Sequence, residues 1–101
     1  TNMIIQKGTK ITLDDYIIYE FALFLIENDI KLEEGMELIT PLAEKYPNNA
    51  SFLYTYGLGL YKQGKYQLSL EALSQSWSNN PYYDHKVFRL QNEVEEILAR
   101  N

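Results

Sequence analysis

The sequence contains a near-repeat with a period of 34 residues, and this period constrains the fold more than any other feature. Pro47 and Pro81 are separated by this interval, and each lies beside a pair of asparagines. The same offset pairs Tyr16 with Ala50, Tyr19 with Leu53, Ile26 with Leu60, Leu32 with Tyr66, Glu37 with Glu71 and Ile39 with Leu73. A period of this length is typical of stacked copies of one supersecondary unit. Such arrays usually present a concave binding surface.

Capping and breaking residues divide the chain into five helical segments. Thr12 is a favourable N-cap, because Asp14 and Asp15 follow it in the first turn. Pro47 and Gly64 are typical of the ends of helices. The apolar spacing predicts helices over about 13–28, 32–45, 50–63, 66–78 and 84–99. Short connections between helices of this length favour antiparallel hairpins, and residues 1–12 form a separate lead-in segment.

The composition is that of one small globular domain, with 101 residues of which 46% are hydrophobic. The absence of cysteine excludes disulfides and thiolate metal sites, and a single histidine argues against any metal site. The net charge is −5, and the acids are concentrated between residues 16 and 47. Nucleic acid is therefore disfavoured as a partner, because phosphate binding needs clustered Lys and Arg. The longest apolar run, 16–26, is too short to span a membrane.

Residues 50–81 carry a motif that resembles a tetratricopeptide repeat (TPR). The positions that match this family are Leu53, Tyr56-Gly57, Leu60, Gly64-Lys65-Tyr66, Ser69, Leu73, Ser76 and Pro81. The preceding 34 residues match more weakly, through Tyr19, Ala22-Leu23, Ile26, Leu32, Gly35, Ile39, Leu42 and Pro47. In this alignment Leu23 stands where the family has glycine, and it faces Gly35 across the hairpin.

The resemblance implies an all-α fold, a TPR-like superhelix of two helix-turn-helix repeats followed by a C-terminal capping helix. The segments are a lead-in at 1–12, a degenerate repeat at 13–47, a second repeat at 48–81 and a capping helix at 82–101. Every signature residue also has a simpler interpretation as core packing, which defines the fold and carries no function.

The resemblance also assigns a concave groove to one face of the first, third and fifth helices. The residues expected to bind a partner there are Glu20, Phe24, Glu27, Tyr54, Leu58, Tyr61, Phe88 and Arg89. Tyrosine and phenylalanine are effective interface anchors, whereas Glu20 and Glu27 would form an acidic rim. The alternative is that Phe24, Tyr54 and Tyr61 only pack against neighbouring helices.

Other functions find little support in the sequence. The basic clamp with which some TPR domains bind acidic chaperone tails does not carry over, because Glu20 and Phe24 replace its first-helix residues. His85 beside Asp84 is better explained by helix capping than by catalysis. The Gly57-Leu58-Gly59 segment lies in a predicted helix, without the preceding strand of a phosphate loop. We therefore expect no enzyme activity and no cofactor.

The sequence favours a protein-interaction module, a scaffold or adaptor, that binds a protein or peptide with apolar and basic character and belongs to a larger protein. Two alternatives stay open: a self-association domain that forms a homodimer, and a small chaperone for a secreted partner. The helix over 13–28 is apolar nearly all round, so its outer face should be covered by residues 1–12, by another domain or by a second copy. No signal peptide is visible, and a targeting segment could lie outside this sequence. The compartment therefore stays open, with a cytoplasmic location favoured.

Overall fold

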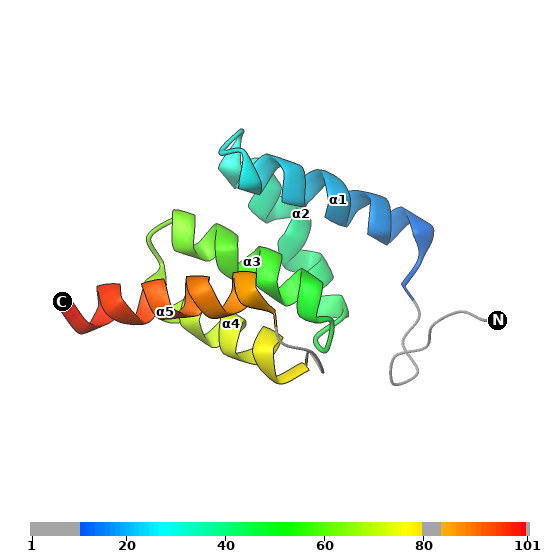
Figure 1. Cartoon of the computed structure of the whole chain (residues 1–101). Coiled ribbons are helices and arrows are strands. Elements are labelled where there is room, and N and C mark those ends of the chain that lie inside the picture. Colours follow the sequence, from blue (N-terminus) through cyan, green and yellow to red (C-terminus); the bar gives the residue numbers. More distant parts are fainter. Residues whose placement is uncertain (1–10, 80–83, 101) are drawn as a thin grey trace.

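The computed structural model describes residues 11–79 and 84–100, and these residues form five α-helices without a strand (Figure 1). The helices are α1 (Leu13–Glu27), α2 (Leu32–Lys45), α3 (Ala50–Lys62), α4 (Tyr66–Asn79) and α5 (His85–Arg100). The predicted helices are thus confirmed, with ends that differ by at most one residue. The expectations for residues 1–10 lie outside the described residues.

The helices form two hairpins, α1–α2 and α3–α4, and α5 packs against the second of them (Figure 1). Helix α3 lies at the centre and contacts the other four helices. The core contains the side chains with the least exposure, among them Ile26, Ile39, Phe52, Leu73, Val87 and Val94. All five helices contribute to the core cluster, so the described residues share one continuous apolar interior.

Helix ends are satisfied by the capping groups that the sequence offers. The Thr12 hydroxyl accepts a 3.1 Å hydrogen bond from the Asp15 backbone N–H, which confirms the predicted N-cap of α1. Asn49 caps α3 by accepting from the Phe52 N–H at 3.0 Å. Gly64 follows α3 with φ +82°, the left-handed conformation expected of a glycine after a helix.

The two hairpins differ in the length of their interhelical loops, which the 34-residue period does not reveal. The N–H of Ile30 closes the end of α1 on the Leu25 carbonyl, and the N–H of Lys65 closes α3 on the Leu60 carbonyl, each at 2.9 Å. Asp29, with φ 56°, likewise corresponds to Gly64. These equivalent positions are 35 residues apart, whereas α2 and α4 begin 34 residues apart. The first interhelical loop therefore contains one extra residue, Lys31, which also has a positive φ of 48°.

This extra residue corrects the alignment of α1. The position that faces Gly35 is occupied by Ala22 and not by Leu23: a Cβ at Gly35 would lie 3.5 Å from the Ala22 carbonyl oxygen and 2.8 Å from Ile26 Cγ1. In the second hairpin, Ser69 contacts Gly57 in the same way. Both hairpins thus bring small residues together where their helices approach, and the expected large-for-small exchange at Leu23 was wrong.

Lys62, at the end of α3, joins the two hairpins. Its ammonium group donates hydrogen bonds to the carbonyl oxygens of Ile26 at 2.9 Å and Glu27 at 3.4 Å. It also forms a 2.9 Å ion pair with Asp29. The last carbonyls of α1 carry the negative end of the helix dipole and lack partners within the helix, so a cation is favourable there.

Candidate functional site

A hollow of about 130 Å³ lies between α1, α3 and the start of α5. Its lining consists of Tyr19, Leu23, Glu27, Ala50, Ser51, Tyr54, Asp84 and Lys86. Because a helical residue shares its face with the residues three and four positions away, α1 turns Tyr19, Leu23 and Glu27 towards this hollow together.

A second hollow, of about 230 Å³, continues from the first between α3 and α5. It is lined by Tyr54, His85, Lys86, Arg89, Leu90 and Glu93. The two hollows share Tyr54 and Lys86, so they form one depression across three helices. We call this depression the concave groove.

Two half-buried tyrosines form the aromatic part of the concave groove. Burial is the main cause that raises the pKa of Tyr54, and the carboxylates of Glu27 and Asp84 raise it further. Burial also raises the pKa of Tyr19. Both phenols therefore stay neutral, and each presents a flat apolar ring with a hydroxyl group that can donate to a ligand.

A third tyrosine closes the side of the groove between α3 and α5. The Tyr61 hydroxyl donates a 2.8 Å hydrogen bond to the Glu93 carboxylate. This bond is the main cause that raises the pKa of Tyr61. Tyr61 thus links α3 to α5, and its hydroxyl is already engaged within the chain.

The charges along the groove are mixed. Glu27, Asp84 and Glu93 carry negative charge, and Lys86 and Arg89 carry positive charge. The acids and bases alternate across a short distance, so an extended ligand would need charges of both signs. The expectation of an acidic rim therefore omits the basic side chains that lie beside the acids.

The structure separates the eight residues predicted to bind a partner. Tyr54, Glu27 and Arg89 line the concave groove, and Tyr61 borders it. Leu58 belongs to the core and is only 9% exposed, so it cannot serve as an accessible groove floor. Glu20 and Phe24 are exposed but belong to the lining of neither hollow.

Phe88 also lies outside the groove lining, since its ring packs against Trp77 of α4 with the ring centroids 6.2 Å apart. The misplacement has the same cause as that of Glu20 and Phe24. Each was aligned with a residue of α3 at an offset of 34, whereas α1, α3 and α5 succeed one another at 35. Sequence reasoning missed Tyr19, Leu23 and Lys86 for this reason. The differing lengths of the two interhelical loops were the signal that would have found them.

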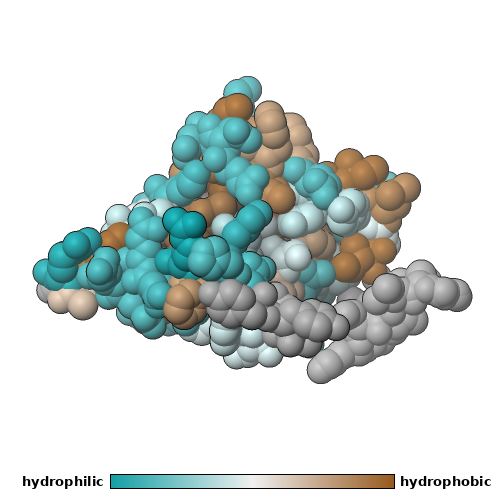
Figure 2. Space-filling model, in the orientation of Figure 1, coloured by the Kyte–Doolittle hydropathy of each residue, from teal (hydrophilic) through white to brown (hydrophobic). Residues whose placement is uncertain are grey.

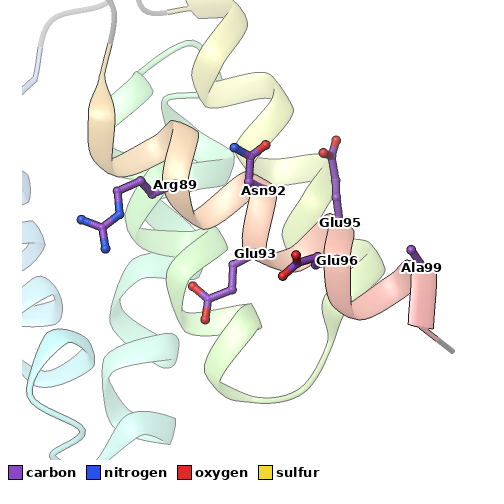
Figure 3. A pocket seen from close by; sticks show the side chains of 6 residues that line it. All are labelled: Arg89, Asn92, Glu93, Glu95, Glu96 and Ala99. Atoms are coloured by element: carbon purple, nitrogen blue, oxygen red, sulfur yellow. The ribbon is translucent and has the colours of Figure 1, made fainter.

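Two larger depressions lie elsewhere on the surface. One, of about 490 Å³, lies between α2 and α3 and is lined in part by Met36, Tyr56 and Leu60. The other, of about 650 Å³, is lined by residues of α5 alone. Figure 3 shows that the side chains of this second depression fan out from one helix, with no opposing wall. Neither depression is lined by three helices as the concave groove is.

Within the described ranges, no group of three or more His, Cys, Asp and Glu side chains is placed to hold a metal ion. None of the helices in the same residues combines the length and the apolar character needed to cross a bilayer. Comparisons of the chain with protein-family models, with curated proteins and with solved structures found no match.

Proposed function

We propose that this chain is a protein-interaction module with a TPR-like arrangement, which binds a segment of another protein in the concave groove. The support for the arrangement is the succession of two antiparallel hairpins, each with small residues at its closest approach, followed by a single packed helix. An array of this kind offers a surface that runs across several helices, which suits an elongated ligand.

The observation that carries the proposal is the position of Tyr54. It is the half-buried aromatic residue shared by both hollows, so a ligand that runs along the groove passes over it. Tyrosine on a rigid helix loses little conformational freedom on binding, which makes it an effective anchor. Tyr19 and Leu23 extend the apolar surface towards α1.

The charges beside Tyr54 indicate the chemistry of the ligand. A segment with an apolar side chain over Tyr54 would place a Lys or Arg near Glu27 and Asp84, and an acid near Lys86 and Arg89. Such pairs mainly set orientation and association rate, and the buried aromatic contact supplies most of the affinity. Catalysis and a bound cofactor form no part of this proposal.

Site-specific photocrosslinking in the source cell tests the groove. A photoreactive amino acid at Leu23 or at Lys86 should capture the same partner, because both positions line one hollow. The control position is Gln67, which is exposed on α4 away from the groove. Tyr54→Ala should reduce capture from both groove positions. Equal capture from Gln67, or capture that Tyr54→Ala leaves unchanged, would contradict the proposal.

A further inference from the structure

Helices α1, α3 and α5 have equivalent faces, and these faces differ in how the rest of the chain covers them. The hydrogen bonds Leu53 N–H to Asn49 and Phe88 N–H to Asp84 show that α5 follows α3 at an interval of 35, as α3 follows α1. The equivalent positions are Ile17, Glu20 and Phe24 on α1, Phe52, Thr55 and Gly59 on α3, and Val87, Leu90 and Val94 on α5. We call this set the outer face of each helix.

On α3 the first hairpin covers the outer face. The Phe52 ring packs against Tyr19 of α1 and against Tyr46 at the end of α2, with centroid separations of 4.9 and 5.4 Å. Gly59 is buried, and a Cβ added there would meet the side chain of Met36 of α2 first. A pair of antiparallel helices therefore seals this face.

On α5 the second hairpin covers the outer face in turn. Val87, Leu90 and Val94 are 1%, 8% and 0% exposed, and α5 contacts both α3 and α4. The same face is thus closed twice within the chain, each time by a helical hairpin.

On α1 the corresponding side chains are open. Ile17 is 56% exposed and Phe24 is 53% exposed, with Leu13 at 72% on the same stripe and Phe21 at its side. In Figure 2, hydrophobic side chains gather on the part of the surface where α1 lies in Figure 1. None of the described residues covers them, so the expectation that this face would be covered is not met within the described ranges. An apolar surface of this kind is typical of a contact site.

The centre of the outer face of α1 adds a chemical requirement. Glu20 stands where α3 has Thr55, whose hydroxyl is satisfied by the Ser51 carbonyl at 2.9 Å, and where α5 has Leu90. The Tyr16 hydroxyl donates a hydrogen bond to this carboxylate. A partner that covers Glu20 removes the remaining water from the carboxylate, and a positive charge compensates best for that loss. An occupant that seals the outer face of α1 as the other two are sealed is therefore favoured if it brings a Lys or Arg to Glu20.

Two arrangements of a second copy of this chain are disfavoured by charge. Helix α1 contains no Lys or Arg, so pairing between two α1 helices would bring acids together. The open side of α5 carries Glu93, Glu95 and Glu96 beside the single base Arg89, so a head-to-tail contact through α5 would bring mainly acids towards Glu20 (Figure 3).

We propose that the outer face of α1 is a second docking site, separate from the concave groove, for a helical hairpin of a partner protein. The partner places apolar side chains on Ile17 and Phe24, and a Lys or Arg between them on Glu20. The hairpins that cover α3 and α5 within the chain indicate how such a partner would pack. Glu20 would select partners that carry a positive charge at the matching position.

A pair of stapled synthetic helices tests this site. Each is a fluorescent amphipathic helix of roughly five turns with an apolar stripe. One carries a central Arg in the stripe, and the other carries Glu at that position. The folded chain should bind the Arg helix at least about tenfold more tightly than the Glu helix, as measured by fluorescence anisotropy. Glu20→Arg should reverse this preference, whereas the matched change Glu96→Arg, on the exposed side of α5, should keep it.

Further variants determine where the helix binds. Ile17→Ser combined with Phe24→Ser should remove binding of both helices, and circular dichroism should show unchanged helical content because both side chains are exposed. Tyr54→Ala should leave the affinity for the Arg helix unchanged. The proposal for this site and the proposal for the concave groove can therefore be tested independently.

Four results would overturn the proposal. The first is equal affinity for the two helices, and the second is binding that survives the double serine variant. The third is a dimer in sedimentation experiments that Ile17→Ser dissociates, because a second copy would then be the occupant. The fourth is a chain without residues 1–10 that binds the Arg helix at least about tenfold more tightly than the full chain, because the lead-in segment would then fill the site.

Discussion

The Ser69 hydroxyl donates a 2.7 Å hydrogen bond to the carbonyl oxygen of Gly57, and both residues are buried between α3 and α4. A helical carbonyl usually meets only its own helix, so this bond requires the neighbouring helix to come near. Gly57 permits that approach because it has no side chain.

Gly57→Ala should destabilise the fold by about 1–3 kcal/mol through overpacking. The added Cβ would lie 3.0 Å from Cγ and Cδ2 of Leu73, a fully buried side chain. Gly59→Ala is the matched control two residues away, where the flexible Met36 side chain is met first and can move aside. Urea unfolding of both variants measures the difference. Equal losses would show that the α3–α4 contact is not especially tight at Gly57.

Lys31→Gly should stabilise the fold by about 1 kcal/mol, since a left-handed conformation is unfavourable for a residue with a Cβ. Lys31 has φ 48° and is exposed, so the change removes strain without removing a core contact. Lys31→Ala is the control and should bring no such gain. Gly64→Ala, at φ +82°, should cost about as much as Lys31→Gly gains. Thermal unfolding of the three variants measures these changes, and a destabilising Lys31→Gly would contradict the argument.

Asp15 should make stability depend on pH in the acid range. Its Oδ2 accepts hydrogen bonds from Lys45 at 2.8 Å and from the buried Tyr46 hydroxyl at 2.6 Å. The bond from Lys45, and then that from Tyr46, lowers the pKa of Asp15 below its ordinary value of 3.8. A lowered pKa in the folded state contributes stability that is present above the ordinary value and is lost as the pH falls through the lowered one.

Asp15→Asn should therefore lower the stability at neutral pH by about 1 kcal/mol, a modest value because Lys45 is largely exposed. The difference between the wild type and Asp15→Asn should close as the pH falls below 3.8. Melting temperatures measured across this range check the prediction. Glu44→Gln, which changes the same charge on an exposed residue of α2, is the control. A difference that persists in strong acid would mean that Asp15 acts without its charge.

Leu23 and Phe24 are neighbours in α1, and their alanine variants should each weaken binding at a different site. Leu23→Ala should weaken binding of the partner captured in the concave groove by about tenfold if Leu23 is an anchor, and Phe24→Ala should leave it unchanged. The stapled Arg helix should lose affinity only with Phe24→Ala. Binding titrations with both ligands give four values. If Phe24→Ala weakens groove binding as strongly as Leu23→Ala, the assignment of faces on α1 is wrong.

The sequence predicts the helices well because its signals are local. Thr12, Pro47 and Gly64 each act on the backbone within a few residues, and the apolar stripes of α2 and α5 determine which sides are buried. The face of α1 that lines the groove needed more than local information. A shift of one residue turns a helix by about 100°. The extra residue Lys31 therefore moved the prediction from Tyr19 and Leu23 to Glu20 and Phe24.

The burial of Leu58 was beyond the sequence for a different reason. Leu58 belongs to an apolar stripe that fits either a groove or a neighbouring helix. Which of the two covers it depends on how closely the other helices approach α3, and no spacing within a single helix contains that distance.

The contacts of Lys62 have a consequence for motion. In a stack held by nearest-neighbour contacts, the outermost helix frays most easily. Lys62 ties the last turn of α1 to the centre of the molecule. The first turns carry exposed Leu13 and Ile17, and their described polar links to α2 are the bonds of Asp15 to Lys45 and Tyr46. Opening of α1 should therefore begin at its N-terminal end and stop near Ile26. Amide hydrogen exchange should run fastest in the early turns of α1, with the amides beside Ile26 exchanging as slowly as those of α3.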